Sequence, residues 1–220
     1  METFTININQ TDKLFFTSDL HLGHFRIAQL CNRPYQSCKE MNDALIDNWN
    51  KTVPPDGIVI NCGDLMLLKN NSNNLQENIK VCNKLNGKQI LVRGNHDSVP
   101  EYEESGYKKY TNFNLEYHED NLIKICDMLK IRIIDNSNNQ LAIIFACHYP
   151  LLTFPHRVYN DTYQVYGHIH TLFDGSRTGF DSDIKDKLLP NQYDVGVDQN
   201  DYTPVSYNQL ISIFNKKHKN

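Results

Sequence analysis

The sequence of 220 residues contains no apolar run of the roughly 20 residues that a membrane-spanning helix needs. Residues 1–5 also lack the basic segment followed by an apolar stretch that marks a secretory signal. Neither sign of charge dominates, because 22 Lys and Arg stand against 26 Asp and Glu, for a formal net charge of −4. Such a chain has no general field to attract long nucleic acids or anionic membranes. We expect a cytoplasmic protein without a membrane partner, which holds any charged substrate locally.

Paired cysteine motifs are missing as well. The six cysteines form no Cys-x-x-Cys pair and are few for a disulfide scaffold of this length. We therefore expect reduced thiols that fill the core. No internal repeat, linker or domain boundary is recognisable, and this length can bury one substantial core. The sequence predicts a single domain over residues 1–220.

Histidine, in contrast, is concentrated in one set of positions. Six of the nine histidines lie in or beside five short polar motifs that follow one another along the chain. Each motif comes after an apolar run bounded by Gly, Asp or Asn, a pattern typical of a buried strand. If these strands share one sheet, their carboxyl ends bring the motifs to one edge, where open α/β sheets place their sites. The motifs are Asp19-Leu20-His21, Gly63-Asp64, Gly94-Asn95-His96-Asp97, His148 and Gly167-His168-Ile169-His170.

The segments between the motifs predict an α/β protein with mixed strands. Strand, helix and strand alternate through the first hundred residues, which implies parallel pairing. Residues 129–146 predict an antiparallel hairpin across a polar turn. Ser37 and Glu40 form a capping box before an apolar stripe at helical spacing, and a second capping box opens a helix near residues 206–214. Between them, a helix is expected over about residues 75–85, ended by Asn86-Gly87.

The ordered motif set resembles the calcineurin-like metallophosphoesterase superfamily. The superfamily pattern is Asp-x-His, Gly-Asp, Gly-Asn-His-Asp/Glu, His and Gly-His-x-His, and the resemblance covers roughly residues 14–170. Residues 18–24, 31–35 and 194–198 are similar to small stand-alone phage-type and bacterial members. The resemblance implies a four-layer α/β/β/α sandwich.

The same resemblance implies two divalent metal ions. Imidazole and carboxylate ligands without thiolate suit Mn²⁺, Fe²⁺, Zn²⁺, Ni²⁺ or Co²⁺, and we expect Mn²⁺ because of its availability. An isolated Asp in a turn is more often a cap, and an isolated His a hydrogen-bonded residue, but the ordered set favours metal ligation. The superfamily pattern gives Asp19, His21 and His170 to the first metal and Asn95, His148 and His168 to the second, with Asp64 bridging both.

A metal pair of this kind activates water for attack on phosphorus. The resemblance assigns His96 as the catalytic histidine that protonates the leaving oxygen, with Asp97 orienting its ring. The alternative is that His96 only hydrogen-bonds a ligand. Asn95 is also a candidate substrate contact, and His24 could touch substrate, support a ligand or lie on the surface. Arg33 is a candidate for binding a substrate phosphate, with a structural arginine as the alternative.

One departure from the superfamily bears on the substrate. Protein phosphatases of this superfamily carry Gly-Asp-x-x-Asp-Arg at the second motif, where residues 63–68 of this chain read Gly-Asp-Leu-Met-Leu-Leu. An apolar wall suits a phosphodiester better than a dianionic monoester, so we expect a metal-dependent phosphodiesterase acting on a nucleotide-like or cyclic-nucleotide substrate. The alternatives are a phosphomonoesterase and a non-catalytic scaffold, although the complete ligand set argues against a scaffold. A purely structural metal site would want a closed four-ligand cage.

Overall fold

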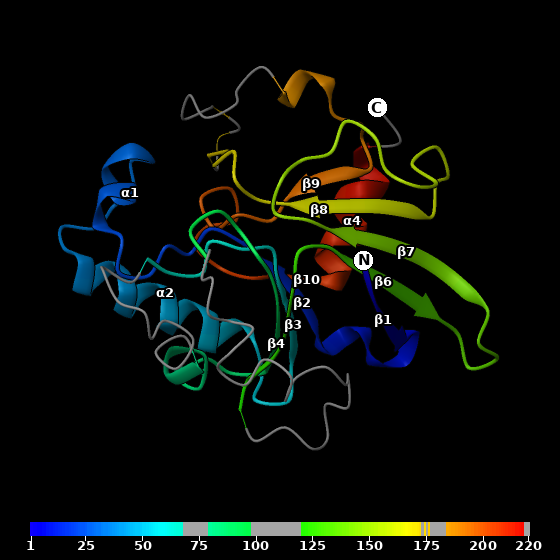
Figure 1. Ribbon diagram of the computed structural model, residues 1–220, viewed down its shortest axis with the longest axis horizontal. Helices are drawn as coiled ribbons and strands as arrows, with labels where there is room; N and C mark the ends of the chain where they lie inside the picture. Colours follow the sequence, from blue (N-terminus) through cyan, green and yellow to red (C-terminus); the bar gives the residue numbers. More distant parts are fainter. Residues whose placement is uncertain (68–78, 98–119, 173, 175, 177–183, 218–220) are drawn as a thin grey trace.

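Two five-stranded sheets face each other in the computed structural model (Figure 1), which describes residues 1–67, 79–97, 120–172, 174, 176 and 184–217. We name the sheets after their central strands. The β7 sheet contains, in spatial order, β1 (Glu2–Asn7), β6 (Leu129–Ile134), β7 (Gln140–Ala146), β8 (Thr162–Tyr166) and β9 (Gln192–Asp194). The β3 sheet contains β10 (Val205–Ser206), β2 (Leu14–Thr17), β3 (Ile58–Asn61), β4 (Lys88–Val92) and β5 (Leu122–Cys126). The α-helices that lie wholly within the described residues are α1 (Phe25–Leu30), α2 (Cys38–Thr52) and α4 (Tyr207–Lys217), and the described 3-10 helices include η1 (Ile8–Lys13) and η5 (Lys185–Lys187).

The pairing of the strands confirms most of the sequence prediction. β2, β3, β4 and β5 are parallel, and β6 and β7 form the expected antiparallel hairpin. β7, β8 and β9 are parallel, so the α/β class with mixed strands is confirmed. The condition that all motif-bearing strands share one sheet is not met. β2, β3 and β4 belong to the β3 sheet, whereas β7 and β8 belong to the β7 sheet.

Apolar side chains fill the space between the sheets and cover their outer faces. The interior cluster takes residues from both sheets and from α4. On the outer face of the β3 sheet, α2 buries Met41, Leu45 and Trp49. The outer face of the β7 sheet packs Phe145 against Phe154 of a loop, and no α-helix in the described ranges covers it.

Local signals in the sequence set the start of the longer helices. The side chain of Ser37 accepts the backbone N–H of Glu40 at 3.1 Å, which confirms the capping box of α2. At the start of α4, the Gln209 side chain accepts the N–H of Ser206 at 2.9 Å, and Ser206 Oγ accepts the N–H of Gln209 at 3.3 Å. All six cysteines are free, as expected.

The helix α4 contributes a stacked aromatic pair to the interior, and this pair gives a test of the packing. Phe214 is fully buried and lies on Tyr163 of β8, with ring centres 4.4 Å apart and planes inclined by 11°. Phe214→Ala should lower the free energy of unfolding by about 3–5 kcal/mol, because it removes a buried ring and leaves a cavity. Urea denaturation measures this loss. The exposed control Tyr159→Ala should stay within about 0.5 kcal/mol of wild type, and a similarly small change in Phe214→Ala would contradict the packing described.

Candidate metal centre

The five sequence motifs come together where the carboxyl ends of β2, β3 and β4 in one sheet approach those of β7 and β8 in the other. β2, β3 and β4 lead into the first three motifs, and β7 and β8 lead into the last two. The N–H of Asp19 donates to the carbonyl of Gly63 at 2.9 Å, which joins the first motif to the second. A bridge between Ser18 and Gly196 connects the end of β2 to the segment after β9, so it links the sheets. The fold therefore brings distant parts of the sequence to one place.

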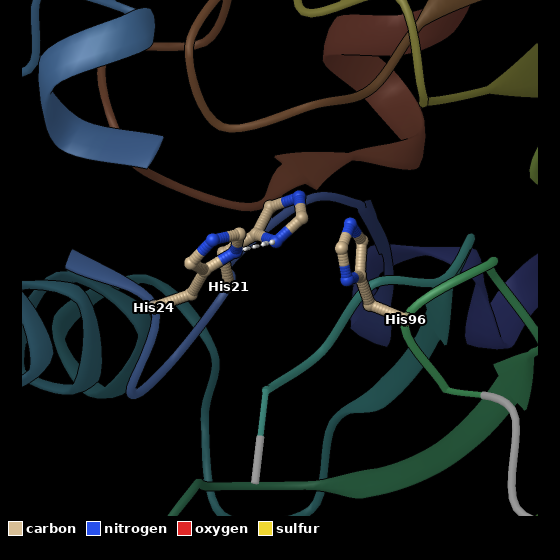
Figure 2. Close-up of side chains that lie close together, drawn as sticks. All are labelled: His21, His24 and His96. Carbon is tan, nitrogen blue, oxygen red and sulfur yellow. Dashed lines mark hydrogen bonds between the residues drawn. The ribbon is translucent and has the colours of Figure 1, made fainter. Parts of the chain in front are cut away.

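Three imidazoles gather beside the first motif (Figure 2). Nδ1 of His24 lies 3.3 Å from Nδ1 of His21, and the ring centres of His21 and His96 are 4.9 Å apart. Burial holds the pKa of His21 well below its ordinary value, and burial followed by the nearby His96 lowers the pKa of His24. Both rings are therefore neutral at neutral pH, the form in which imidazole binds a metal. Of the roles left open for His24, this contact favours support of a ligand.

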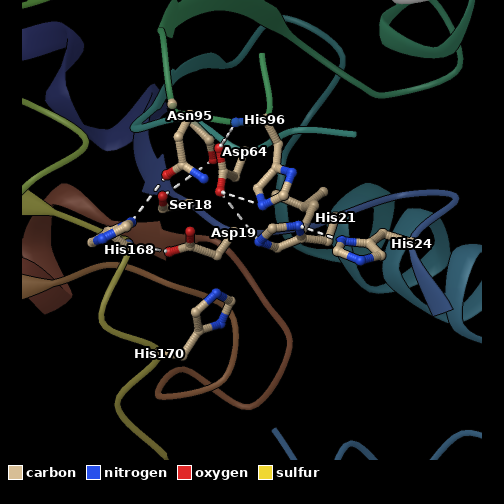
Figure 3. Close-up of polar contacts among 12 residues, drawn as sticks. Ser18, Asp19, His21, His24, Asp64, Asn95, His96, His168 and His170 are labelled. Carbon is tan, nitrogen blue, oxygen red and sulfur yellow. Dashed lines mark hydrogen bonds and ion pairs between the residues drawn. The ribbon is translucent and has the colours of Figure 1, made fainter. Parts of the chain in front are cut away.

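Asp19, His21 and His170 form a buried group suited to one divalent cation (Figure 3). Their ligand atoms all lie within 4.8 Å of one another. Asp19 Oδ1 and His21 Nε2 are buried and have no hydrogen-bond partner in the protein. A buried polar atom left unpaired costs about 1–3 kcal/mol. A cation at this point would satisfy both atoms, so these residues fit the metal that the sequence assigns to them.

Asp64 lies between imidazoles that come from both sheets. Its Oδ2 is 3.4 Å from His21 Nε2 and 3.6 Å from His148 Nε2. A second group of close, buried ligand atoms contains Asp19, Asp64 and His148. This placement suits a carboxylate that bridges two cations. It also adds a feature that the sequence did not indicate, because Asp19 belongs to both groups rather than to the first alone.

The predicted ligands of the second metal meet at the side chain of Asn95. Its Oδ1 lies 3.0 Å from His148 Nε2 and 3.0 Å from His168 Nδ1. Nδ1 of His148 lies 2.8 Å from the carbonyl of Cys62 and donates to it, which leaves Nε2 as the electron-pair donor. The N–H of His168 donates to Asp19 Oδ2 at 3.0 Å. The structure thus brings the whole predicted ligand set together.

The backbone of the ligand loops is strained. Half of the ten described residues other than glycine that have positive φ are predicted metal ligands. Such conformations cost on the order of 1–3 kcal/mol each and persist only where the surroundings enforce them. The strain is therefore concentrated where the side chains converge. The five ligands are Asp19, His21, Asp64, His168 and His170, with φ values of 59°, 51°, 52°, 71° and 45°.

Two motif glycines make room for the carboxylates. A Cβ atom on Gly94 would overlap the carboxylate of Asp64, and one on Gly167 would overlap the side chains of Ser18 and Asp19. Any larger residue at these positions would push a ligand out of place. The glycines that precede Asn95 and His168 in the motifs are thus explained by close approach of the backbone to the ligands.

The candidate general acid borders the ligand cluster without being buried in it. The side chain of His96 is 33% exposed, and its Nε2 lies 4.0 Å from Asp64 Oδ2. The N–H of His96 donates to Asp64 Oδ1 at 2.8 Å, which holds the loop against the carboxylate. A ring in this position can face both the ligand cluster and a molecule arriving from solvent.

The expectation that Asp97 orients the ring of His96 is wrong. Its carboxylate accepts the backbone N–H groups of Asp64 at 2.6 Å, Leu65 at 3.1 Å and Gly94 at 2.9 Å, and the residue is buried. Burial raises the pKa of Asp97 to about 6, although the Gly94 N–H opposes the rise. Asp97 therefore fixes the turn that carries Asp64. Adjacency to His96 in the sequence did not reveal this role.

Of the two roles left open for Arg33, the structure favours the structural one over binding of a substrate phosphate. Its side chain is fully buried, and its Nε and Nη2 donate to the two carboxylate oxygens of Asp198 at 2.7 and 2.9 Å. Asp198 Oδ2 also accepts Nδ1 of His170 at 2.8 Å. Burial alone would raise the pKa of Asp198, but Arg33 and His170 outweigh it and hold the pKa below its ordinary value. Asp198 was not among the predicted site residues, because its only signal in the sequence is the similarity of residues 194–198 to small superfamily members.

A curated protein and a solved structure are similar to this chain. An uncharacterized protein of Methanocaldococcus jannaschii is 41% identical over 100 residues, which are 44% of this chain and 55% of that protein. The chain therefore spans about half the length of this curated relative. A crystal structure of a protein of unknown function from Aquifex aeolicus matches with a TM-score of 0.57 and 20% identity, over 91% of this chain and 98% of that one. At this identity, the match shows likeness of fold alone.

The part of the chain that the structure describes contains no helix long and apolar enough to cross a membrane. The sequence model of a family described as calcineurin-like phosphoesterase matches residues 13–172, which include all five motifs. Because this match spans most of the chain, the protein belongs to the calcineurin-like phosphoesterase family.

Proposed function

We propose that the protein is a metal-dependent phosphodiesterase that acts on a nucleotide-like or cyclic-nucleotide substrate. Membership of the family supports metal-dependent hydrolysis of phosphoesters in general. The observation that carries the proposal is the pair of buried ligand groups that share Asp19, next to the partly exposed ring of His96. Preference for a diester is supported by the leucines at positions 67 and 68, where protein phosphatases carry Asp-Arg, and by the inward direction of Arg33. Leu65 and Met66 belong to the core and do not face a substrate.

In this proposal, one set of residues binds the metals and a separate residue, His96, transfers a proton. Two divalent ions bound here, for which we propose Mn²⁺, would supply an activated water and neutralise charge on the phosphate. Asp64 and Asp19 supply the negative charge that holds the cations. The carbonyl of Cys62 keeps the proton of His148 on Nδ1 and so presents Nε2 to the ligand cluster. His96, at the exposed edge, donates the proton that the leaving oxygen needs.

The reaction class can be tested with two chromogenic esters. Purified protein supplied with Mn²⁺ should hydrolyse bis-p-nitrophenyl phosphate faster than p-nitrophenyl phosphate, because leucines stand where protein phosphatases carry the Asp-Arg pair. EDTA should abolish both activities. Initial rates of p-nitrophenolate release provide the measurement. The opposite order of rates would indicate a phosphomonoesterase, and no hydrolysis of any diester by protein with two bound metals would indicate a scaffold.

The shared carboxylates predict unequal effects of ligand substitutions on metal content. Asp64→Asn should reduce occupancy of both metals, and Asp19→Asn should do the same because Asp19 lies in both ligand groups. His21→Ala should mainly weaken one metal. Elemental analysis after dialysis against Mn²⁺ measures the occupancy, with Asp127→Asn, an exposed carboxylate, as the control. Two full metals and intact activity in Asp64→Asn would contradict the bridging assignment.

The role of His96 can be separated from that of the metals by the choice of leaving group. A ribose alkoxide needs a proton to leave, whereas nitrophenolate leaves readily without one. His96→Ala should therefore lose about 10²–10⁴-fold in rate on a nucleotide diester and much less on bis-p-nitrophenyl phosphate, with both metals bound. The exposed His156→Ala should leave both rates unchanged. Equal losses on both esters would show that His96 positions the phosphate instead of acting as the acid.

A further inference from the structure

A buried ion pair lies directly behind the metal-ligand cluster. Arg33 donates through Nε and Nη2 to the two oxygens of Asp198, at 2.7 and 2.9 Å, in the two-pronged geometry that suits guanidinium and carboxylate. The two side chains are 0% and 1% exposed. Replacing a buried ion pair by apolar residues is often neutral or stabilising. Stability alone therefore gives little reason for this pair. Its other contacts are with the segments that carry metal ligands.

The remaining donors of Arg33 hold the strained turn of the first motif. Nη2 donates to the carbonyl of Asp19 at 2.7 Å, and Nη1 donates to that of Leu20 at 2.9 Å. These carbonyls belong to the Asp-x-His turn, in which Asp19 and His21 have φ values of 59° and 51°. The guanidinium thus fixes the backbone that directs two ligands of one metal position.

Asp198 holds the third ligand of the same position. Its Oδ2 accepts the proton on Nδ1 of His170 at 2.8 Å, which fixes the orientation of the imidazole ring. His170 follows β8, and Asp198 follows β9, so both come from the β7 sheet, whereas Asp19 and His21 come from the β3 sheet. One ion pair therefore joins the ligand-bearing edges of the two sheets.

We propose that Arg33 and Asp198 are positioning residues for the metal held by Asp19, His21 and His170. This inference rests on the metal centre of the proposed function. The other metal position is anchored separately, because His148 is held by the carbonyl of Cys62. The two positions share Asp19, but His21 and His170 belong to the first group alone. Loss of the pair should therefore weaken this metal much more than the other.

A separate metal site at this point is disfavoured. Cys31, His170 and Asp198 have ligand atoms within 4.8 Å of one another. However, both carboxylate oxygens of Asp198 already accept N–H groups of Arg33, whose positive charge opposes a cation there. The cluster serves as support for His170 and not as a third metal position.

The test is the affinity of each metal position in the full chain. We expect Asp198→Asn and Arg33→Lys to lower one of the two Mn²⁺ affinities by about 10–100-fold and to change the other much less. Isothermal titration of metal-free protein with Mn²⁺ gives both affinities, and electron paramagnetic resonance should show an isolated ion in place of a coupled pair. Asp127→Asn removes the exposed ion pair with Arg93, at 3.5 Å, and is the matched control with unchanged affinities.

A purely structural role would give a different result. It would lower the thermal midpoint of the metal-free protein and leave both Mn²⁺ affinities at wild-type values, which would overturn the proposal. If the single variants do not fold, the double variant Arg33→Leu with Asp198→Leu removes both buried charges and should still show the selective loss. Two wild-type affinities in that variant would equally overturn it. Because binding is the readout, wild-type protein that binds two metals and hydrolyses no diester would contradict the proposed function alone.

Discussion

Two buried carboxylates, Asp19 and Asp64, facing the same set of imidazoles are the constraint on which the rest of the site depends. Burial raises the pKa of Asp19 to about 6, although His170 and His148 oppose the rise. Negative charge in such a place is costly unless cations accompany it. Close-packed glycines, left-handed loops and a bridge between the sheets all serve to hold these two side chains where cations can reach them.

Much of the architecture could be predicted from local patterns. Apolar runs identified the strands before the motifs, and the capping box located the start of α2. The division of the strands between two sheets could not be predicted, because an apolar run indicates that a strand is buried but not which strand it pairs with. The predicted convergence of the ligands is nevertheless observed, because the ligand-bearing strand ends of the two sheets lie next to each other. A helix predicted over about 75–85 falls partly outside the described residues, of which 79–82 are helical.

The roles of the supporting residues were the least predictable part of the site. Asp97 is adjacent to His96 in sequence, yet the turn directs its carboxylate to backbone N–H groups of another loop. Arg33 and its partner Asp198 are 165 positions apart. Motif patterns record which side chains are needed near the metals, but the direction of a side chain depends on backbone angles and distant partners. The ligands could therefore be predicted from the sequence, whereas the residues that hold them in place could not.

The left-handed conformation of five ligands also limits how the metal preference of such a site can drift during evolution. At positive φ, glycine, asparagine, aspartate and histidine are tolerated, whereas branched or bulky residues are strongly penalised. Exchange of Asp19 or His170 for glutamate or cysteine would thus meet a backbone barrier besides the change in ligand chemistry. Asn95 and His148 are not among the described residues with positive φ. Among the predicted ligands, these two positions can therefore be substituted at the lowest conformational cost.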